Sequence, residues 1–218
     1  MPRATTENIL HSYLAAIERE LQQGIAREHS YRPALKTLIE TLYPGTLATN
    51  EPKRIRCGAP DYIVTDGQVP LGYIEAKDIG VSLVQIESDS EKAHPTTREG
   101  EQLRRYRESL SNLIFTDYLE FRWFLKGKRE LVGRLATLKG KKTLLPDSDG
   151  AERTKQLLQS YMQARTPTVT TPRELATRMA AIAKLIRVTI ERVFEDKEEG
   201  AGSLQSQLLI SAEASKVC

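Results

Sequence analysis

The feature that most constrains this 218-residue sequence is the stretch over residues 60–78, where two short β-rich runs flank Asp66-Gly67. An Asp-Gly dipeptide favours tight hairpin turns, and the runs beside it contain the Val, Ile and Tyr residues that strands prefer. The stretch therefore predicts a β-hairpin. Because the segments around it have helical periodicity, we expect a mixed α/β core.

Two helices are predicted before the hairpin. Apolar residues recur at helical spacing over 9–21 and again over 35–42. Pro33 suits the first turn of the second helix, and Tyr43-Pro44-Gly45 has the residues that end one.

After the hairpin, residues 101–113 have helical spacing, and the apolar and aromatic run over 119–125 predicts a strand. Lys126-Gly127-Lys128 is typical of a turn, and a last strand is expected over 131–135. The expected order is helix, helix, hairpin, helix, hairpin.

The C-terminal third is expected to be helical. Residues 139–150 have the composition of a polar linker, residues 151–165 predict a helix, and Thr171-Pro172-Arg173-Glu174 forms a capping box with proline at the first helical position. The predicted boundaries are a core domain over 1–148, a helix and linker over 149–170, and an amphipathic helix with a tail over 171–218.

Composition narrows the function classes. A net charge of +3 permits a nucleic-acid partner without requiring one, because only clustered charge makes a binding face. Two separated cysteines and three scattered histidines argue against a zinc site or a disulfide framework. No apolar run approaches the roughly 18 residues of a membrane span, and the first residues lack a secretory signal. We expect a cytoplasmic protein without a membrane partner.

The hairpin carries the residues suited to chemistry. Side chains alternate along a strand, so Glu75 and Lys77 share one face. If the loop is the five residues Asp66 to Pro70, Asp61 lies directly opposite Glu75 on that face. The corresponding pairs are Thr65 with Leu71 and Ile63 with Tyr73. A two-residue loop would instead place Asp61 across from Gly72.

Two carboxylates on adjacent strands suit a hard cation such as Mg²⁺, which takes one or two carboxylates together with waters and substrate phosphates. A lysine beside them can stabilise the charge that builds on a phosphate during hydrolysis of a phosphodiester. The alternative is a surface salt bridge on a strand edge, since acid-x-Lys triplets are common and two others occur in this chain.

Pro60-Asp61 together with Glu75-Ala76-Lys77 resembles the PD-(D/E)xK nuclease motif, and the order of elements is similar to the common core of that superfamily. Most of the chain further resembles the N-terminal endonuclease region of single-chain (type IIG/ISP-like) restriction-modification proteins, in which an adenine DNA methyltransferase follows. The stretches that carry this second resemblance are SYRPALKTLIETL (30–42), GAPDYIV (58–64), GYIEAKDIG (72–80), GEQLRRYRESLSNLIFTDYLEFRWF (100–124) and TPRELATRMAAIAKLIR (171–187).

The resemblance implies a role for each motif residue. Asp61 and Glu75 would bind the metal, and Lys77 would assist the attacking water. Glu40 matches a position where the superfamily often has an acid that reaches the site, and its alternative is a solvated helix carboxylate.

Gln102 and Tyr106, four residues apart on one helix face, look like the QxxxY element that orients the lysine or contacts substrate. Tyr106 could equally be a core residue. Four arginines around the same helix could meet DNA phosphates or could simply form a solvated face: Arg98, Arg104, Arg105 and Arg107.

The resemblance implies a restriction-endonuclease-like mixed β-sheet core flanked by helices, with a C-terminal helical extension. The expected function is a Mg²⁺-dependent DNA endonuclease, with Mn²⁺ able to substitute, acting as the nuclease module of a restriction-modification system. Its expected partners are double-stranded DNA, a methyltransferase or specificity module in cis or in trans, and a second copy that meets it transiently on DNA. The alternatives are a non-catalytic DNA-binding or scaffolding module and a freestanding repair or recombination nuclease. No GxGxxG or P-loop sequence is present, so no nucleotide cofactor is expected.

Overall fold

The computed structural model describes residues 5–52, 55, 57–140 and 142–164, followed by five single helical residues: Ala176, Met179, Ala180, Ala183 and Arg187. The chain divides into two compact units, Met1–Thr168 and Val169–Cys218. The helix expected after Thr171 lies, apart from those five residues, outside the described residues. Within them, no helix combines the length and apolar character that a bilayer crossing needs.

The first unit contains five helices and eight strands among its described residues. The helices are α1 (Thr6–Gln23), α2 (Glu28–Leu42), α3 (Leu83–Ser90), α4 (Arg98–Ser109) and α5 (Gly150–Gln163). The strands are β1 (Thr46–Asn50), β2 (Tyr62–Asp66), β3 (Val69–Ala76), β4 (Asn112–Thr116), β5 (Glu120–Leu125), β6 (Lys128–Arg134), β7 (Ala136–Lys139) and β8 (Thr143–Pro146).

A six-stranded mixed sheet forms the centre of this unit. Its strands lie in sequence order from β1 to β6, and all neighbours are antiparallel except β3 and β4, which are parallel. A parallel pair needs a crossover connection, and α3 and α4 supply it. Strands β7 and β8 form a separate antiparallel pair.

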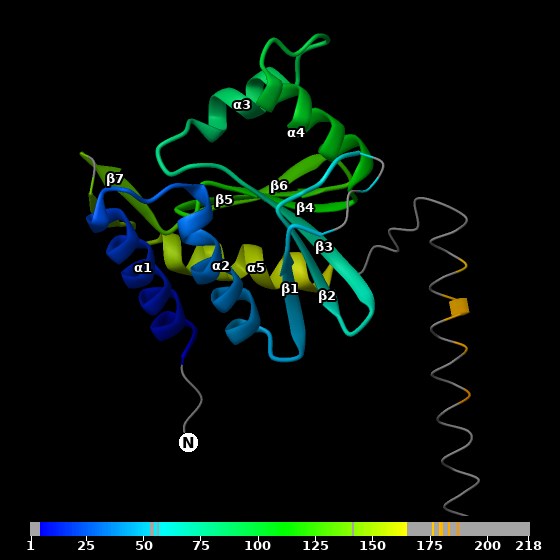
Figure 1. The fold of residues 1–218 in the computed structure, drawn as a ribbon, viewed down its shortest axis with the longest axis horizontal. Helices are drawn as coiled ribbons and strands as arrows, with labels where there is room; N and C mark the ends of the chain where they lie inside the picture. The colour runs from blue at the N-terminus through cyan, green and yellow to red at the C-terminus, as the bar shows by residue number, and fades with distance from the viewer. Residues whose placement is uncertain are drawn as a thin grey trace, which may run out of the picture. The chain divides into compact units, whose positions relative to one another are not determined.

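Helices cover both faces of the sheet (Figure 1), with α3 and α4 on one face and α1, α2 and α5 on the other. Alternation along the strands divides the buried side chains accordingly. Tyr73 and Phe115 belong to the core cluster under α3 and α4, whereas their strand neighbours Ile74 and Ile114 belong to the cluster that includes α1, α2 and α5.

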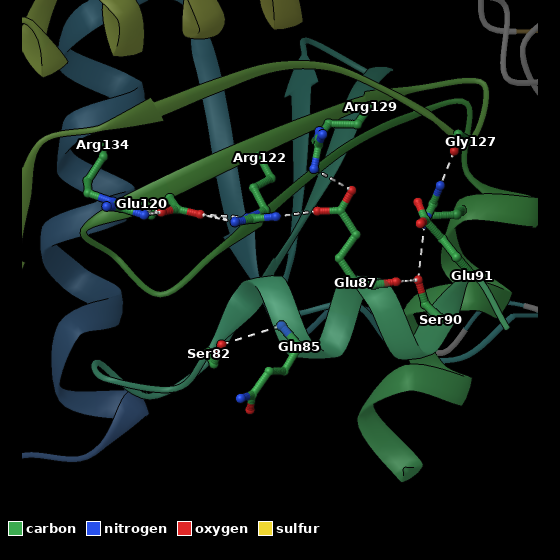
Figure 2. Close-up of polar contacts among 11 residues, drawn as sticks. Ser82, Gln85, Glu87, Ser90, Glu91, Glu120, Arg122, Gly127, Arg129 and Arg134 are labelled. Atoms are coloured by element: carbon green, nitrogen blue, oxygen red, sulfur yellow. Dashed lines mark hydrogen bonds and ion pairs between the residues drawn. The ribbon is translucent and has the colours of Figure 1, made fainter. Parts of the chain in front are cut away.

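Charged as well as apolar side chains attach helix α3 to the sheet. Glu87 of α3 pairs with Arg122 of β5, and Glu120 pairs with Arg122 and Arg134 (Figure 2). Arg129 also pairs with Glu87, with 3.0 Å between Arg129 Nη1 and Glu87 Oε1. The side chains of Glu87, Glu120 and Arg122 are 4%, 7% and 5% exposed, so these charges are satisfied by one another rather than by water.

The structure confirms the two N-terminal helices but moves the start of the second. Helix α2 begins at Glu28, where the Ser30 hydroxyl accepts a hydrogen bond from the Arg27 N–H. Pro33 therefore lies inside the helix rather than in its first turn, so the prediction was wrong. Contacts from beyond the first turn also hold this early start, since the Tyr118 hydroxyl donates to the Glu28 carbonyl at 3.0 Å and Arg32 pairs with the Glu28 carboxylate at 2.9 Å.

The hairpin is confirmed, but its loop is not the expected one. Asp66 pairs with Val69 and Thr65 with Pro70, which leaves a two-residue turn, Gly67-Gln68. A β-bulge then leaves Leu71 unpaired, so Val64 pairs with Gly72 and Ile63 with Tyr73. The extra residue restores the pairing that the five-residue loop would have produced, and Asp61 still falls at the level of Glu75.

Several elements were missed. Strand β1 and helix α3 were not expected, and the linker expected over 139–150 contains β8. The helix expected over 101–113 overlaps the first two residues of β4, whose other residues were assigned to no element. Helix α5 confirms the helix expected over 151–165. It contributes Leu157, Leu158 and Tyr161 to the core, so the packing of the first unit continues past residue 148.

Candidate active site

Glu75 and Lys77 lie together where β3 ends. The Lys77 ammonium is 2.7 Å from Glu75 Oε1, and its backbone N–H donates to the carbonyl of Thr116 at 2.8 Å, which extends the ladder between β3 and β4 by one residue. Glu75 is the more buried of the two, with a side chain 3% exposed against 16% for Lys77. The alternation expected from the sequence is confirmed.

Asp61 enters the same site from the residue before β2. Its Oδ2 accepts a hydrogen bond from the Ala76 N–H at 2.8 Å, so the carboxylate is held directly against the backbone between Glu75 and Lys77. Its Oδ1 pairs with the Arg32 guanidinium at 2.5 Å. The hairpin register thus brings the three motif residues together.

Arg32 is a site residue that the sequence did not reveal. This α2 side chain is 8% exposed and bonds Asp61, Glu28 at 2.9 Å and Glu51 at 2.8 Å. Desolvation by burial lowers the pKa of Arg32, but the charge of Asp61 and the hydrogen bond to Glu28 raise it by more, so the pKa lies above its usual value. An arginine on an amphipathic helix gives no signal of such a role, because its partners lie up to 29 residues away.

Gln102 and Tyr106 fix the lysine from α4. Gln102 Oε1 accepts a hydrogen bond from Lys77 at 3.1 Å, and Gln102 Nε2 donates to the Tyr106 hydroxyl at 3.3 Å. Tyr106 is 1% exposed and packs against Gly58, where a Cβ would lie 3.0 Å from the ring and where φ is +137°. The two sequence interpretations of Tyr106 therefore both apply, since the residue is in the core and in contact with the site.

The surroundings of Glu75 disfavour the ionised form of its carboxyl group. Burial, with Asp61 beside it, raises the pKa of Glu75 to about 7, against the lowering effect of Lys77. Its second oxygen, Oε2, is buried and has no hydrogen-bond partner within the described part of the chain. A buried polar atom without a partner is costly, and a bound cation would satisfy this one.

A cleft of about 720 Å³ opens in front of Lys77, Gln102 and Tyr106. Glu28, Asp78 and several residues of α3 and α4 line its other walls. Glu75, whose side chain is 3% exposed, is not among the residues that line the cleft. Asp78 also lines the cleft, two residues after β3 ends at Ala76.

The structure does not bring Glu40 to this cluster. Its carboxylate accepts a hydrogen bond from the Ala48 N–H at 3.0 Å and pairs with Lys36 at 3.0 Å, so it holds the edge strand β1. Glu28 is the α2 acid that lines the cleft. A catalytic role for Glu40 stays a prediction that these contacts do not support.

The donor set fits a magnesium ion. No group of three or more His, Cys, Asp or Glu side chains gathers as a metal site among the described residues. Magnesium is commonly held by only one or two carboxylates, the remaining ligands being waters and phosphates, and Asp61 with the unpartnered Glu75 Oε2 meets that requirement. The ion would share Asp61 with Arg32 and Glu75 with Lys77.

No protein-family model matches the chain, and no curated protein matches it. Among solved structures, a chain of the cryo-EM structure of a DrdV–DNA complex is similar to it, with a TM-score of 0.54 over 74% of this chain and 100% of that chain. The sequences are 18% identical over the match, a level at which the likeness describes the fold alone. The chain therefore has a mixed α/β, restriction-endonuclease-like fold, with a six-stranded sheet flanked by helices.

Proposed function

We propose that the protein is a magnesium-dependent DNA endonuclease of the PD-(D/E)xK type. The observation that carries the proposal is the joint placement of Asp61, Glu75 and Lys77 at the end of β3, with an unpartnered buried oxygen on Glu75. The similarity in fold to a chain of a DrdV–DNA complex supports DNA as the substrate. Manganese would substitute for magnesium.

Asp61 and Glu75 would hold the ion. When bound, the ion would polarise the scissile phosphate and lower the pKa of a water, which would then lose a proton more readily and become a better nucleophile. Lys77 donates to phosphate oxygens from the wall of the cleft and offsets the negative charge that develops there. Gln102, itself tied to Tyr106, keeps the Lys77 ammonium in place, so less ordering is needed when the substrate binds.

Three further points remain proposals: a role in restriction, a methyltransferase or specificity partner, and the pairing of two copies on DNA. They rest on the resemblance of the sequence to single-chain restriction-modification proteins. The cytoplasmic location stays a prediction.

The test is nicking of supercoiled plasmid by the full chain in Mg²⁺ or Mn²⁺, with Asp61→Asn, Lys77→Met and Lys155→Met compared to wild type. Lys155 lies on α5 in an exposed ion pair with Glu152 and serves as the matched control. We expect the first two variants to lose about 100-fold or more of the rate, as for other single charge-stabilising groups, and the control to lose nothing.

Calorimetric titration with Mn²⁺ supplies a second readout. We expect binding by the wild type and by Lys77→Met, but not by Asp61→Asn. Nicking that persists in both site variants would refute the proposed site, and wild-type protein that neither binds the ion nor cuts DNA would favour the scaffolding alternative.

A further inference from the structure

We propose that Arg98 and Arg105, on α4, bind the phosphate backbone of the DNA that enters the cleft, an inference that rests on the proposed nuclease function. Both residues line the cleft with Lys77. Helix α4 contains four arginines, and the structure separates them into two pairs with different surroundings.

The first pair, Arg104 and Arg107, is occupied by structural contacts. Arg104 donates to Glu108 at 2.9 Å and to the Ala93 carbonyl at 2.7 Å. Arg107 donates to the carbonyl of Gly127 at 3.0 Å and lies over the ring of Phe124, 4.8 Å from its centre. These two side chains attach α4 to the turn before it and to the β5–β6 turn, and neither lines the cleft.

The second pair is exposed and uncommitted. Among the described residues, no hydrogen bond or ion pair engages Arg98 or Arg105. The two are seven residues apart, with Gln102 between them on the same helix face. Seven residues of helix rise about 10 Å, so the guanidinium groups can reach separate phosphates while Gln102 holds Lys77 between them.

Two helix ends add to the positive potential at this cleft. The capping residues of α3 and α4, Ser82 and Thr97, both line it, and the N-terminal end of a helix favours anions. Three carboxylates line the cleft as well, those of Glu28, Asp78 and Glu99. Glu28 pairs with Arg32 at 2.9 Å, so Asp78 and Glu99 offset most of the added positive potential, and removing one of these two should strengthen DNA binding.

The test is fluorescence anisotropy of a labelled duplex with the full chain, with calcium in place of magnesium and at several NaCl concentrations. The variants are Arg98→Gln, Arg105→Gln and the double variant, and Arg104→Gln is the matched control on the same helix. Each lost phosphate contact should lower the slope of log K against log salt by about 0.9.

Near physiological salt, the loss of one phosphate contact corresponds to about fivefold weaker duplex binding for each single variant, and the loss of two contacts to about 25-fold for the double variant. Arg104→Gln should change the affinity by less than about twofold, Arg98→Lys should keep most of it, and Glu99→Gln should raise it.

The possible failures are distinguishable. Wild-type protein that binds duplex while Arg98→Gln and Arg105→Gln bind equally well, with an unchanged salt slope, would overturn this inference and leave the nuclease proposal standing. An equal loss in Arg104→Gln would also overturn it, because net charge rather than placement would then explain the binding. Wild-type protein that binds no duplex would overturn both proposals.

Discussion

The two faces of the sheet differ in what they bury. Towards α1, α2 and α5 the strands present an apolar layer that includes Phe121 and Trp123, and the buried polar side chains there are uncharged, such as Asn112. Towards α3 and α4 the same strands bury three charged residues, Glu75, Glu120 and Arg122. Burial of apolar side chains on the first face stabilises the fold, whereas desolvation of charged groups on the second face costs free energy. Buried titratable groups of this kind are often found at functional sites.

The largest effect is expected on the apolar face. Phe121 is fully buried, and Phe121→Ala should lower the free energy of unfolding by about 4 kcal/mol, through lost transfer free energy and the cavity that remains. Urea denaturation followed by circular dichroism measures it. A loss below about 1 kcal/mol would mean that this face is not the main source of stability.

A smaller loss is expected one residue along, on the other face. Arg122→Met leaves Glu87 with only Arg129 and Glu120 with only Arg134, so about 3 kcal/mol should be lost. Replacing all three buried ions with apolar residues (Glu87→Leu, Glu120→Leu, Arg122→Met) should recover most of that loss, because no buried charge is then left unpaired and Arg129 and Arg134 are about half exposed to water. A triple variant as unstable as Arg122→Met would show that these ions stabilise the fold on balance.

The smallest expected effect is the change with pH in the unfolding free energy of the metal-free protein. The pKa of Glu75 rises from 4.5 to about 7 on folding, so between these values the folded state binds the proton more tightly than the unfolded state. This contribution to stability is present at low pH and is lost as pH rises, by about 2 kcal/mol from about pH 5 to about pH 8.

The measurement is the difference in unfolding free energy between wild type and Glu75→Gln across that range, in a chelating buffer. Glu75→Gln cannot titrate, so the difference should move in favour of the variant as pH increases. A difference that stays constant with pH would contradict the raised pKa.

What could be predicted from the sequence was local. Alternation along one strand placed Glu75 and Lys77 together, and helical spacing placed Gln102 and Tyr106 on one face, because each relation spans only a few residues. The contact of Arg32 with Asp61 depends on how α2 crosses the end of the sheet, which no periodicity encodes.

Helix α3 was missed for a related reason. Its buried side chains include Glu87 and Asp89, so its pattern of apolar and polar residues does not match its pattern of burial. Strand β4 was missed because Leu113 continues the helical spacing of Leu103, Tyr106 and Leu110, and burial on both faces removes the alternation that marks a strand.

The bulge at Leu71 has a consequence for how the hairpin tolerates changes in length. Because Leu71 has no partner on β2, the hairpin could lose this residue and still pair Ile63 with Tyr73, so Glu75 would keep its direction. Loss of a paired residue such as Tyr73 would turn Glu75 into the layer of α1, α2 and α5. The hairpin thus tolerates the loss of one residue at position 71, whereas the number of residues from Gly72 to Glu75 and Lys77 is fixed by the pairing.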